Sequence, residues 1–353
     1  MTLDLSLPPS ASPVRYAGRP TVRHLRHVLG LTLGSAALVV AVPLVAGVPW
    51  AGIAATVGSV PTAYLVGLVL LWLAGLVAHT VTLTSALPGL SHRRALMLSL
   101  TGSSVSNVLP AGGAAGIALN YRMTRAWGFA RPDFATYTLL TNLWDVLAKL
   151  ALPAVLVPLV LVVGGWQASA LIGVAGVAVG SAVVLGAAAV VLSRPAALVR
   201  AVATVNALVR TARRLARQPP GDGLTVEQVG DWRDDTRALA QARWQPLSGG
   251  MMLYSSLLLA LLLACLHVTG AAVPLGAVAL AFCAERLMTV LPLTPGGLGV
   301  VEVGLVGLLT LAPGSSAAGI ASGVLLYRAL TFGLEIPVGG ALLGGWLWRR
   351  RRG

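Results

Sequence analysis

Long apolar runs separated by arginine-bearing segments dominate the chain. The uninterrupted runs lie at about 28–48, 61–83, 134–163, 168–192, 250–268 and 317–348. Each is close to or above the roughly 20 residues that an α-helix needs to cross a bilayer. Two more apolar stretches, 95–121 and 274–311, are interrupted by clusters of glycine and proline. The pattern predicts an all-α polytopic membrane protein with about six full spans and two broken or re-entrant hairpins.

Composition excludes several other classes. The 353 residues are 56% hydrophobic and only 10% charged, whereas soluble proteins carry about 25% charged residues. The net charge of +14 reflects basic flanks of apolar runs, which indicate topology and contact with anionic headgroups rather than with nucleic acid. Lys149 is the only lysine and the two cysteines lie in apolar runs. We therefore expect no phosphate loop, metal site or cofactor, and no soluble-type catalytic motif.

Arginine placement predicts the topology. Arginines precede the first span and close the chain, so both termini are expected to be cytoplasmic. Basic residues also flank the stretch 95–121 on both sides, which favours a hairpin that enters and leaves on the cytoplasmic side. The predicted segments are a basic tail (1–27), a first membrane half (28–192), an amphipathic cytoplasmic connector (193–248), a second membrane half (249–348) and a basic tail (349–353).

The two broken stretches share a short proline–glycine motif and a similar spacing to a charged residue that follows. Leu-Pro precedes Gly-Gly in both, at 109–113 and at 291–297, and the second stretch is predicted to dip in from the outer face. Pro110 lies 35 residues before Asp145 (145 − 110), and Pro292 lies 36 before Arg328 (328 − 292). These matches favour an inverted repeat whose broken helices form a site near the midplane. Two unrelated kinks are the alternative.

Charges at membrane depth mark the candidate site, because a charge near the bilayer centre costs at least about 2.5–3.5 kcal/mol. Arg328 lies near the middle of its span, and Asp145 is spaced to pair with Lys149. Glu285 is expected to pair with an arginine, in the simplest case from another helix. The full set of candidate substrate-binding residues is Asn107, Pro110, Gly112, Gly113, Arg122, Asp145, Glu285, Arg286, Pro292, Pro295, Gly296, Gly297, Gly299, Glu302, Tyr327 and Arg328.

The segments 286–302 and 107–113, with Arg122 and with Tyr327-Arg328, resemble the lysylphosphatidylglycerol synthase/flippase transmembrane region family. The resemblance covers about 28–348 and implies an integral inner-membrane protein that moves a modified phospholipid or related polar lipid between leaflets. Two departures are visible. No aminoacyl-transfer domain follows the membrane part, so lipid synthesis is not expected. Asn142 stands where the family often has an arginine before the aspartate.

The residues and the resemblance together predict a flippase-like protein of the cell membrane. Its expected partners are the phospholipid substrate, the anionic membrane surface, and a second copy of the chain or a separate lipid-modifying enzyme. A transporter of a soluble metabolite, a membrane-embedded enzyme acting on lipid-linked substrates, and a scaffold that recruits a partner through 193–248 are the alternatives.

Overall fold

The computed structural model describes residues 37–108, 112–163, 226–289 and 294–352. Side chains at 37–38, 157–163, 226–235 and Pro295 lie outside this description. So do the predicted N-terminal tail, the predicted span at 168–192, most of the connector, Pro110 and Pro292. All regular elements in the described part are helices, which confirms the predicted all-α membrane class.

Four of the described helices are long and apolar enough to cross a membrane. They cover Thr62–Ala86, Arg131–Leu156, Thr236–Val268 and Ala317–Arg352. A fifth apolar pair, Val39–Ala46 and Trp50–Gly58, is bent by 84° at the residues between its halves. The bend follows the sequence, because Gly47 adopts a left-handed conformation (φ +67°) and Pro49 precedes the second half.

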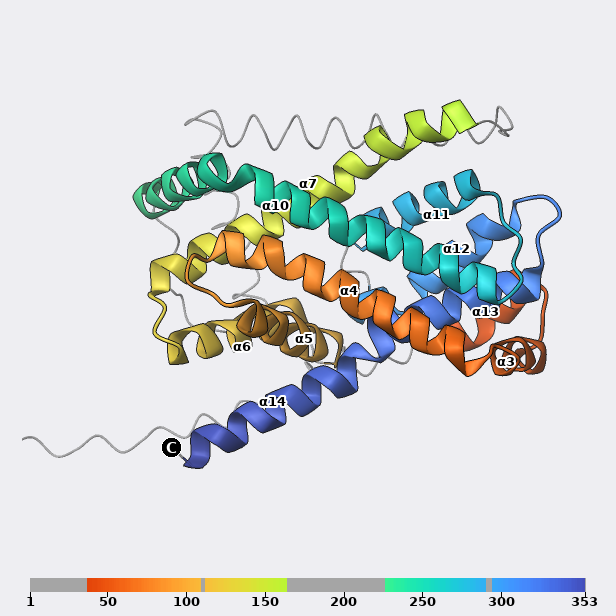
Figure 1. Cartoon of the computed structure of the whole chain (residues 1–353), viewed down its shortest axis with the longest axis horizontal. Helices are drawn as coiled ribbons and strands as arrows, with labels where there is room; N and C mark the ends of the chain where they lie inside the picture. Colours follow the sequence, from red (N-terminus) through yellow and green to blue (C-terminus); the bar gives the residue numbers. More distant parts are fainter. Residues whose placement is uncertain (1–36, 109–111, 164–225, 290–293, 353) are drawn as a thin grey trace, which may run out of the picture.

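The elements follow one another as η1 (Ala37–Ala41), α2 (Val42–Ala46), α3 (Trp50–Gly58), α4 (Thr62–Ala86), α5 (His92–Val108), α6 (Gly112–Ala126), α7 (Arg131–Val163), α10 (Val226–Val268), α11 (Leu275–Met288), η2 (Pro295–Gly297), α12 (Val300–Thr310), α13 (Ala317–Arg328), η3 (Ala329–Gly333) and α14 (Glu335–Arg352). In Figure 1, α4 and α10 run side by side through the centre of the bundle, and their extensive contacts agree with that view.

The bundle has two chemically different ends. The segments that join α4 to α5 and α6 to α7 lie at the left of Figure 1 with the C-terminus, and this arginine-rich end carries Arg93, Arg94, Arg125, Arg131 and Arg349 to Arg352. The connections at 59–61, 269–274 and 311–316 lie at the opposite end and carry no charge. This segregation is typical of a membrane protein with a defined orientation.

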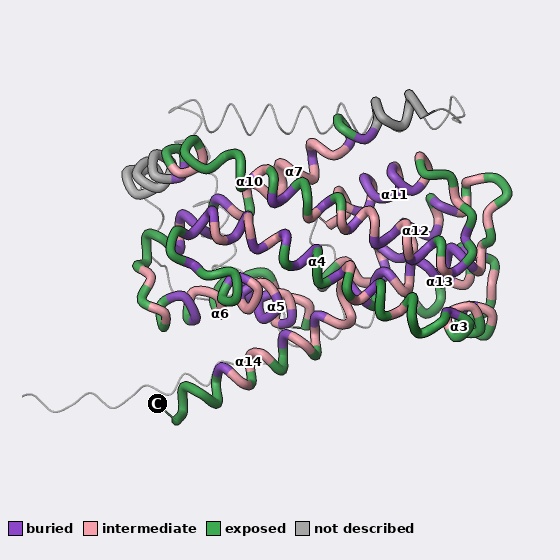
Figure 2. The backbone as a smooth tube through the Cα atoms, in the orientation of Figure 1, coloured by how far each residue is buried: buried purple, intermediate pink, exposed green. Residues whose placement is uncertain are grey.

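Both broken stretches fold as helix pairs that approach the bundle from opposite ends. Helices α5 and α6 pack on each other and both meet the arginine-rich end, whereas α11 and α12 pack on each other and begin and end at the uncharged end. Two helix pairs that enter from opposite ends are the arrangement that the matched proline and glycine motifs predict. Figure 2 shows buried residues gathered where α11, α12 and α13 meet; Phe282, Leu305 and Tyr327 are fully enclosed there.

Helix α10 runs across residue 248, where the sequence predicts the change from an amphipathic connector to a membrane half. It starts at Val226 and continues through Pro246, with one non-helical residue at Arg243. Its segment before residue 250 packs on α4 and α7: Leu247 is fully buried and Trp144 Nε1 donates to Ser248 Oγ at 3.1 Å. The bundle therefore extends beyond the apolar run on which the prediction was based.

Candidate functional site

The two breaks meet in the middle of the fold. Asn107 lies in the last turn of α5, and a Cβ placed on Gly296 would come within 3.0 Å of its Oδ1. The same Cβ would overlap the ring of Phe332. Gly296 also adopts a positive φ of +61°, which other residues rarely adopt. Sequence and packing therefore both require glycine where the second break touches the first.

An ion pair fixes the second break to the last span. The Nε of Arg328 donates to Glu302 Oε1 at 2.7 Å, and a terminal guanidinium nitrogen donates to the backbone oxygen of Gly296 at 2.8 Å. The other carboxylate oxygen of Glu302 accepts from the Gly299 backbone nitrogen at 2.6 Å, at the start of α12. Because both side chains are buried, the pair neutralises two charges and satisfies backbone groups that the break leaves free.

A second buried pair lies on α11. Arg286 pairs with its neighbour Glu285 through two nitrogens, so the expected partner from another helix is replaced by the adjacent residue. Arg286 also donates to the hydroxyl of Tyr327 at 3.3 Å, which links α11 to α13. The cluster thus holds predicted residues from both elements, with Glu285 and Tyr327 fully enclosed.

A polar cavity of about 280 Å³ lies beside the first break, between α4, α5, α6 and α7. Among its walls are Ser103, Ser106, Gly113, Asn120 and Asp145. The complete lining is His79, Leu83, Leu98, Ser99, Gly102, Ser103, Ser106, Gly113, Gly116, Ile117, Asn120, Tyr137, Thr141, Asn142 and Asp145. Ligand pockets for whole small molecules measure about 300–1,000 Å³, so this cavity has room for a headgroup but not for a complete lipid.

Asp145 brings the main charge to this cavity. It pairs with Lys149 at 2.7 Å, as their spacing predicts, and its own side chain remains 43% exposed. His79 also lines the cavity and stacks on Tyr254, with ring centroids 4.6 Å apart. A carboxylate that keeps free lone pairs beside imidazole and amide groups can accept hydrogen bonds from a polar headgroup.

The remaining predicted residues are spread around these features. Gly112 begins α6 so close to α5 that a Cβ would overlap the Ser106 backbone oxygen. Gly297 and Gly299 take positive φ values in the second break, where Pro295 opens the short helix η2. Arg122 is exposed on α6 and does not join the buried pairs. Pro110 and Pro292 fall outside the described residues.

Several site residues escaped the sequence prediction. Ser99, Ser103 and Ser106 are spaced four and three residues apart, which places them on one helical face, and that spacing was the available signal. Asn120 has a side-chain oxygen that is buried in the described structure without a hydrogen-bond partner. The ring of Phe332 lies 5.1 Å from the Arg328 guanidinium carbon. This residue could not be predicted from the sequence, because its contact with Gly296 forms only when the second break is folded.

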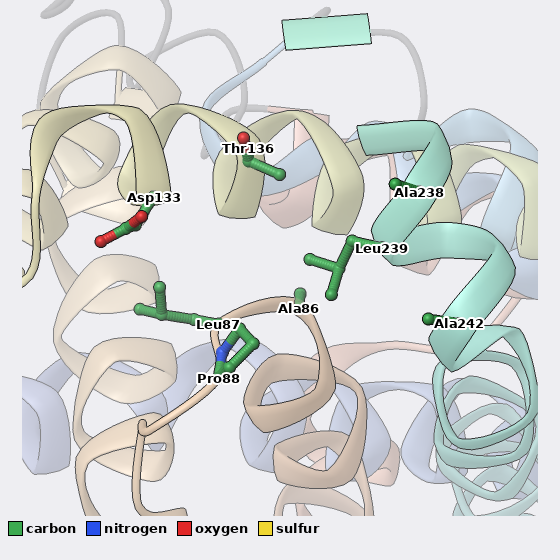
Figure 3. A pocket seen from close by; sticks show the side chains of 8 residues that line it. All are labelled: Ala86, Leu87, Pro88, Asp133, Thr136, Ala238, Leu239 and Ala242. Carbon is green, nitrogen blue, oxygen red and sulfur yellow. The ribbon is translucent and has the colours of Figure 1, made fainter. Parts of the chain in front are cut away.

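A larger cavity of about 580 Å³ lies elsewhere, at the arginine-rich end (Figure 3). Its lining is mostly apolar and comes from α4, α7, α10 and the residues after α4. Asp133 points from α7, and its carboxylate accepts from the Ala130 backbone nitrogen at 3.0 Å, which is a helix-capping contact. None of the predicted site residues lines this cavity, so size alone does not identify the site.

Comparison with known proteins gives one family match. The model of the family described as "Lysylphosphatidylglycerol synthase TM region" matches residues 27–339, which is nearly the whole chain. A search of curated proteins gives no match. The matched range includes both breaks, both buried ion pairs and the polar cavity.

Proposed function

The chain belongs to the lysylphosphatidylglycerol synthase transmembrane region family, a membrane family related to lipid handling, and from that premise we propose that it moves a polar or aminoacylated phospholipid between leaflets. It does so without chemical change to the lipid, so it is not an enzyme. Its location is the plasma membrane, with the arginine-rich end toward the cytoplasm, where basic side chains meet anionic lipid.

One observation carries the proposal: two helix pairs enter the bundle from opposite ends and touch at Asn107 and Gly296, beside a polar cavity. Broken helices from inverted repeats place substrate sites near the midplane in many transporters. A lipid headgroup needs such a polar path, because moving it through hydrocarbon without hydrogen bonds costs several kcal/mol. Its acyl chains can stay in the surrounding bilayer.

The geometry favours a lipid over a soluble metabolite. Ile117 and Asn142 on the cavity wall are exposed, so the polar space reaches the outer surface of the helices, where lipid lies. Asp145 and the amides of Asn120 and Asn142 would meet the polar part of the headgroup, and Arg122 would attract its phosphate. A separate lipid-modifying enzyme would supply an aminoacylated substrate, and a second copy of the chain is the other expected partner.

The test is lipid exchange in vesicles with a matched pair of variants. Asn120 and Thr138 each have a buried side-chain oxygen without a partner, but only Asn120 lines the cavity. Asn120→Leu and Thr138→Val should therefore disturb folding little, since an unpaired polar atom contributes no hydrogen bond to stability. Purified protein is placed in phosphatidylglycerol vesicles with a trace of fluorescent phospholipid, and quenching of the outer leaflet reports exchange.

We expect wild type and Thr138→Val to speed lipid exchange equally, and Asn120→Leu to slow it several-fold. Equal exchange rates for the wild type and both variants would show that the cavity is not part of the lipid path. No acceleration by the wild type over empty vesicles would refute lipid movement itself, and a change in lipid mass after incubation would point to the enzyme alternative.

A further inference from the structure

The polar cavity beside the first break is rich in hydroxyl and amide groups but poor in charge. Seven of its fifteen lining residues carry a hydroxyl or an amide side chain. Asp145 is the only acid among them, and no arginine or lysine of the described chain lines the space. Whether the cavity carries a net charge therefore depends on what neutralises this one carboxylate.

Lys149 neutralises Asp145 from within α7. Its Nζ lies 2.7 Å from Asp145 Oδ2, the lysine side chain is only 15% exposed, and no other acid among the described residues lies within 4 Å of it. A cationic headgroup that displaced the lysine would leave its ammonium group without a counter-ion at membrane depth, which is costly. Because the imidazole of His79 is largely uncharged at neutral pH, the cavity is neutral overall while the lysine stays in place.

The cavity offers both acceptors and donors of hydrogen bonds. The side-chain oxygen of Asn120 is buried without a donor. Asn142 donates its amide to the Thr138 backbone oxygen at 2.7 Å, and the Thr141 hydroxyl donates to the Tyr137 backbone oxygen at 2.8 Å, so both keep an oxygen that can accept. The serine hydroxyls of the wall can donate and accept. An ammonium group only donates and a phosphate only accepts, whereas the hydroxyls of a ligand do both and match the mixed set.

Close packing of α5 on α6 holds this set of groups in position. A Cβ on Gly102 would come within 2.9 Å of Asn120 Nδ2, and a Cβ on Gly116 within 2.3 Å of Ser106 Oγ. The two glycines therefore make the room that the polar side chains of the wall occupy. A preorganised wall of this kind lowers the entropic cost of binding. The volume of about 280 Å³ lies just below that of small-molecule pockets, so the cavity admits one compact polar group.

We propose that the cavity selects an uncharged, hydroxyl-rich headgroup, such as the glycerol of phosphatidylglycerol or one sugar of a glycolipid, over an aminoacylated headgroup with a positive charge. The inference rests on the proposed function and narrows the two kinds of headgroup that it allows. The hydroxyls of the headgroup exchange hydrogen bonds with Asn120, Asn142 and the serines of the wall. A phosphate, where the lipid has one, stays outside the cavity, because no basic residue of the described chain lines it.

Two measurements separate selection of the headgroup from lipid movement. Native mass spectrometry of the full chain in detergent, mixed with equal amounts of phosphatidylglycerol, monoglucosyldiacylglycerol and lysylphosphatidylglycerol, reports which lipid stays bound. Exchange of fluorescent forms of the same three lipids in phosphatidylcholine vesicles reports movement. Methyl glucoside, added as a soluble competitor, distinguishes a lipid headgroup from a free sugar.

The variants change the charge of the cavity and not its shape. Lys149→Met leaves Asp145 without its partner, and the 43% exposed carboxylate can still be hydrated, so the chain should fold. The matched control is the double variant Asp145→Asn/Lys149→Met, which removes both charges and restores a neutral cavity.

We expect the wild type to retain phosphatidylglycerol and the glycolipid at least about tenfold better than lysylphosphatidylglycerol, and the double variant to keep that order. Lys149→Met should shift the preference toward the lysyl lipid, because the unpaired carboxylate then attracts its ammonium groups.

A wild type that prefers the lysyl lipid overturns the proposal, and so does an order of preference that Lys149→Met leaves unchanged. Methyl glucoside that competes as well as the glycolipid would assign the cavity to a soluble sugar and overturn the lipid headgroup as its ligand. If the expected order of binding is found but no lipid moves in vesicles, the proposed function fails while the selectivity of the cavity stands.

Discussion

Replacing Gly296 by alanine tests whether the two breaks meet as described. The new Cβ faces two separate penalties: a positive φ of +61° and overlap with the Phe332 ring. A left-handed conformation costs a residue with a Cβ roughly 1–2 kcal/mol, and an added carbon in a packed site costs about 1–3 kcal/mol. We therefore expect Gly296→Ala to lower the free energy of unfolding by about 2–5 kcal/mol.

Gly314 supplies the matched control. It has a similar φ of +76°, but a Cβ there would meet nothing within 4 Å. Gly314→Ala should therefore show the backbone penalty alone, about 1–2 kcal/mol. The difference between the two variants isolates the overlap at the break.

The chain provides its own probe for this measurement. Its two cysteines, Cys265 and Cys283, are both buried, so a thiol-reactive dye labels them only when the protein opens. Unfolding by increasing SDS in mixed micelles, followed by dye labelling, gives the free energy of each variant. If Gly296→Ala is no less stable than Gly314→Ala, then Phe332 and Asn107 do not lie against Gly296 and the meeting of the breaks is refuted.

Two more predictions use the same unfolding assay. Arg328→Gln and Glu302→Gln should each lower the free energy of unfolding by about 3–5 kcal/mol, because each leaves a buried partner uncompensated. The double variant should lose clearly less than the sum of the two single losses. Additive losses would show that the two side chains are not coupled. Gly339→Ala should be destabilising by at least about 1–3 kcal/mol through overlap with the Leu100 backbone, whereas Gly344→Ala, with open space around it, should be neutral or stabilise by about 0.5–1 kcal/mol. Equal stability of the two glycine variants would contradict the packing of α14 on α5.

The positions of the breaks could be predicted because their cause is local. Proline removes a backbone donor and glycine weakens a helix, so 107–113 and 291–299 interrupt apolar runs in any packing. The end of the bundle from which each helix pair enters could also be predicted, since basic flanks mark one end of a membrane bundle. The pairing of Asp145 with Lys149 depends only on the i,i+4 spacing.

The partners of the deeper charges could be identified only from the folded structure. Arg328 reaches Glu302, 26 residues earlier (328 − 302), only because the connection at 311–316 turns α13 back along α12. Residues 236–248 looked like connector, because polar side chains and Pro246 interrupt the hydropathy there, yet they pack on α4 and α7. Their helix persists because tertiary contacts, such as those of the buried Leu247, outweigh local preference.

The buried pairs also constrain how the second half enters the bilayer. Arg328 and Glu302 lie on separate helices, so a lone α13 would carry an uncompensated guanidinium into hydrocarbon, at a cost of at least about 2.5–3.5 kcal/mol. The same holds for α12 and its glutamate, whereas α11 holds Glu285 and Arg286 side by side and neutralises itself. Helices α12 and α13 therefore gain stability only when they are inserted together, and the Gly296 backbone oxygen gains its donor at the same moment. Formation of the second break and neutralisation of its charges are thus coupled through the two contacts of Arg328.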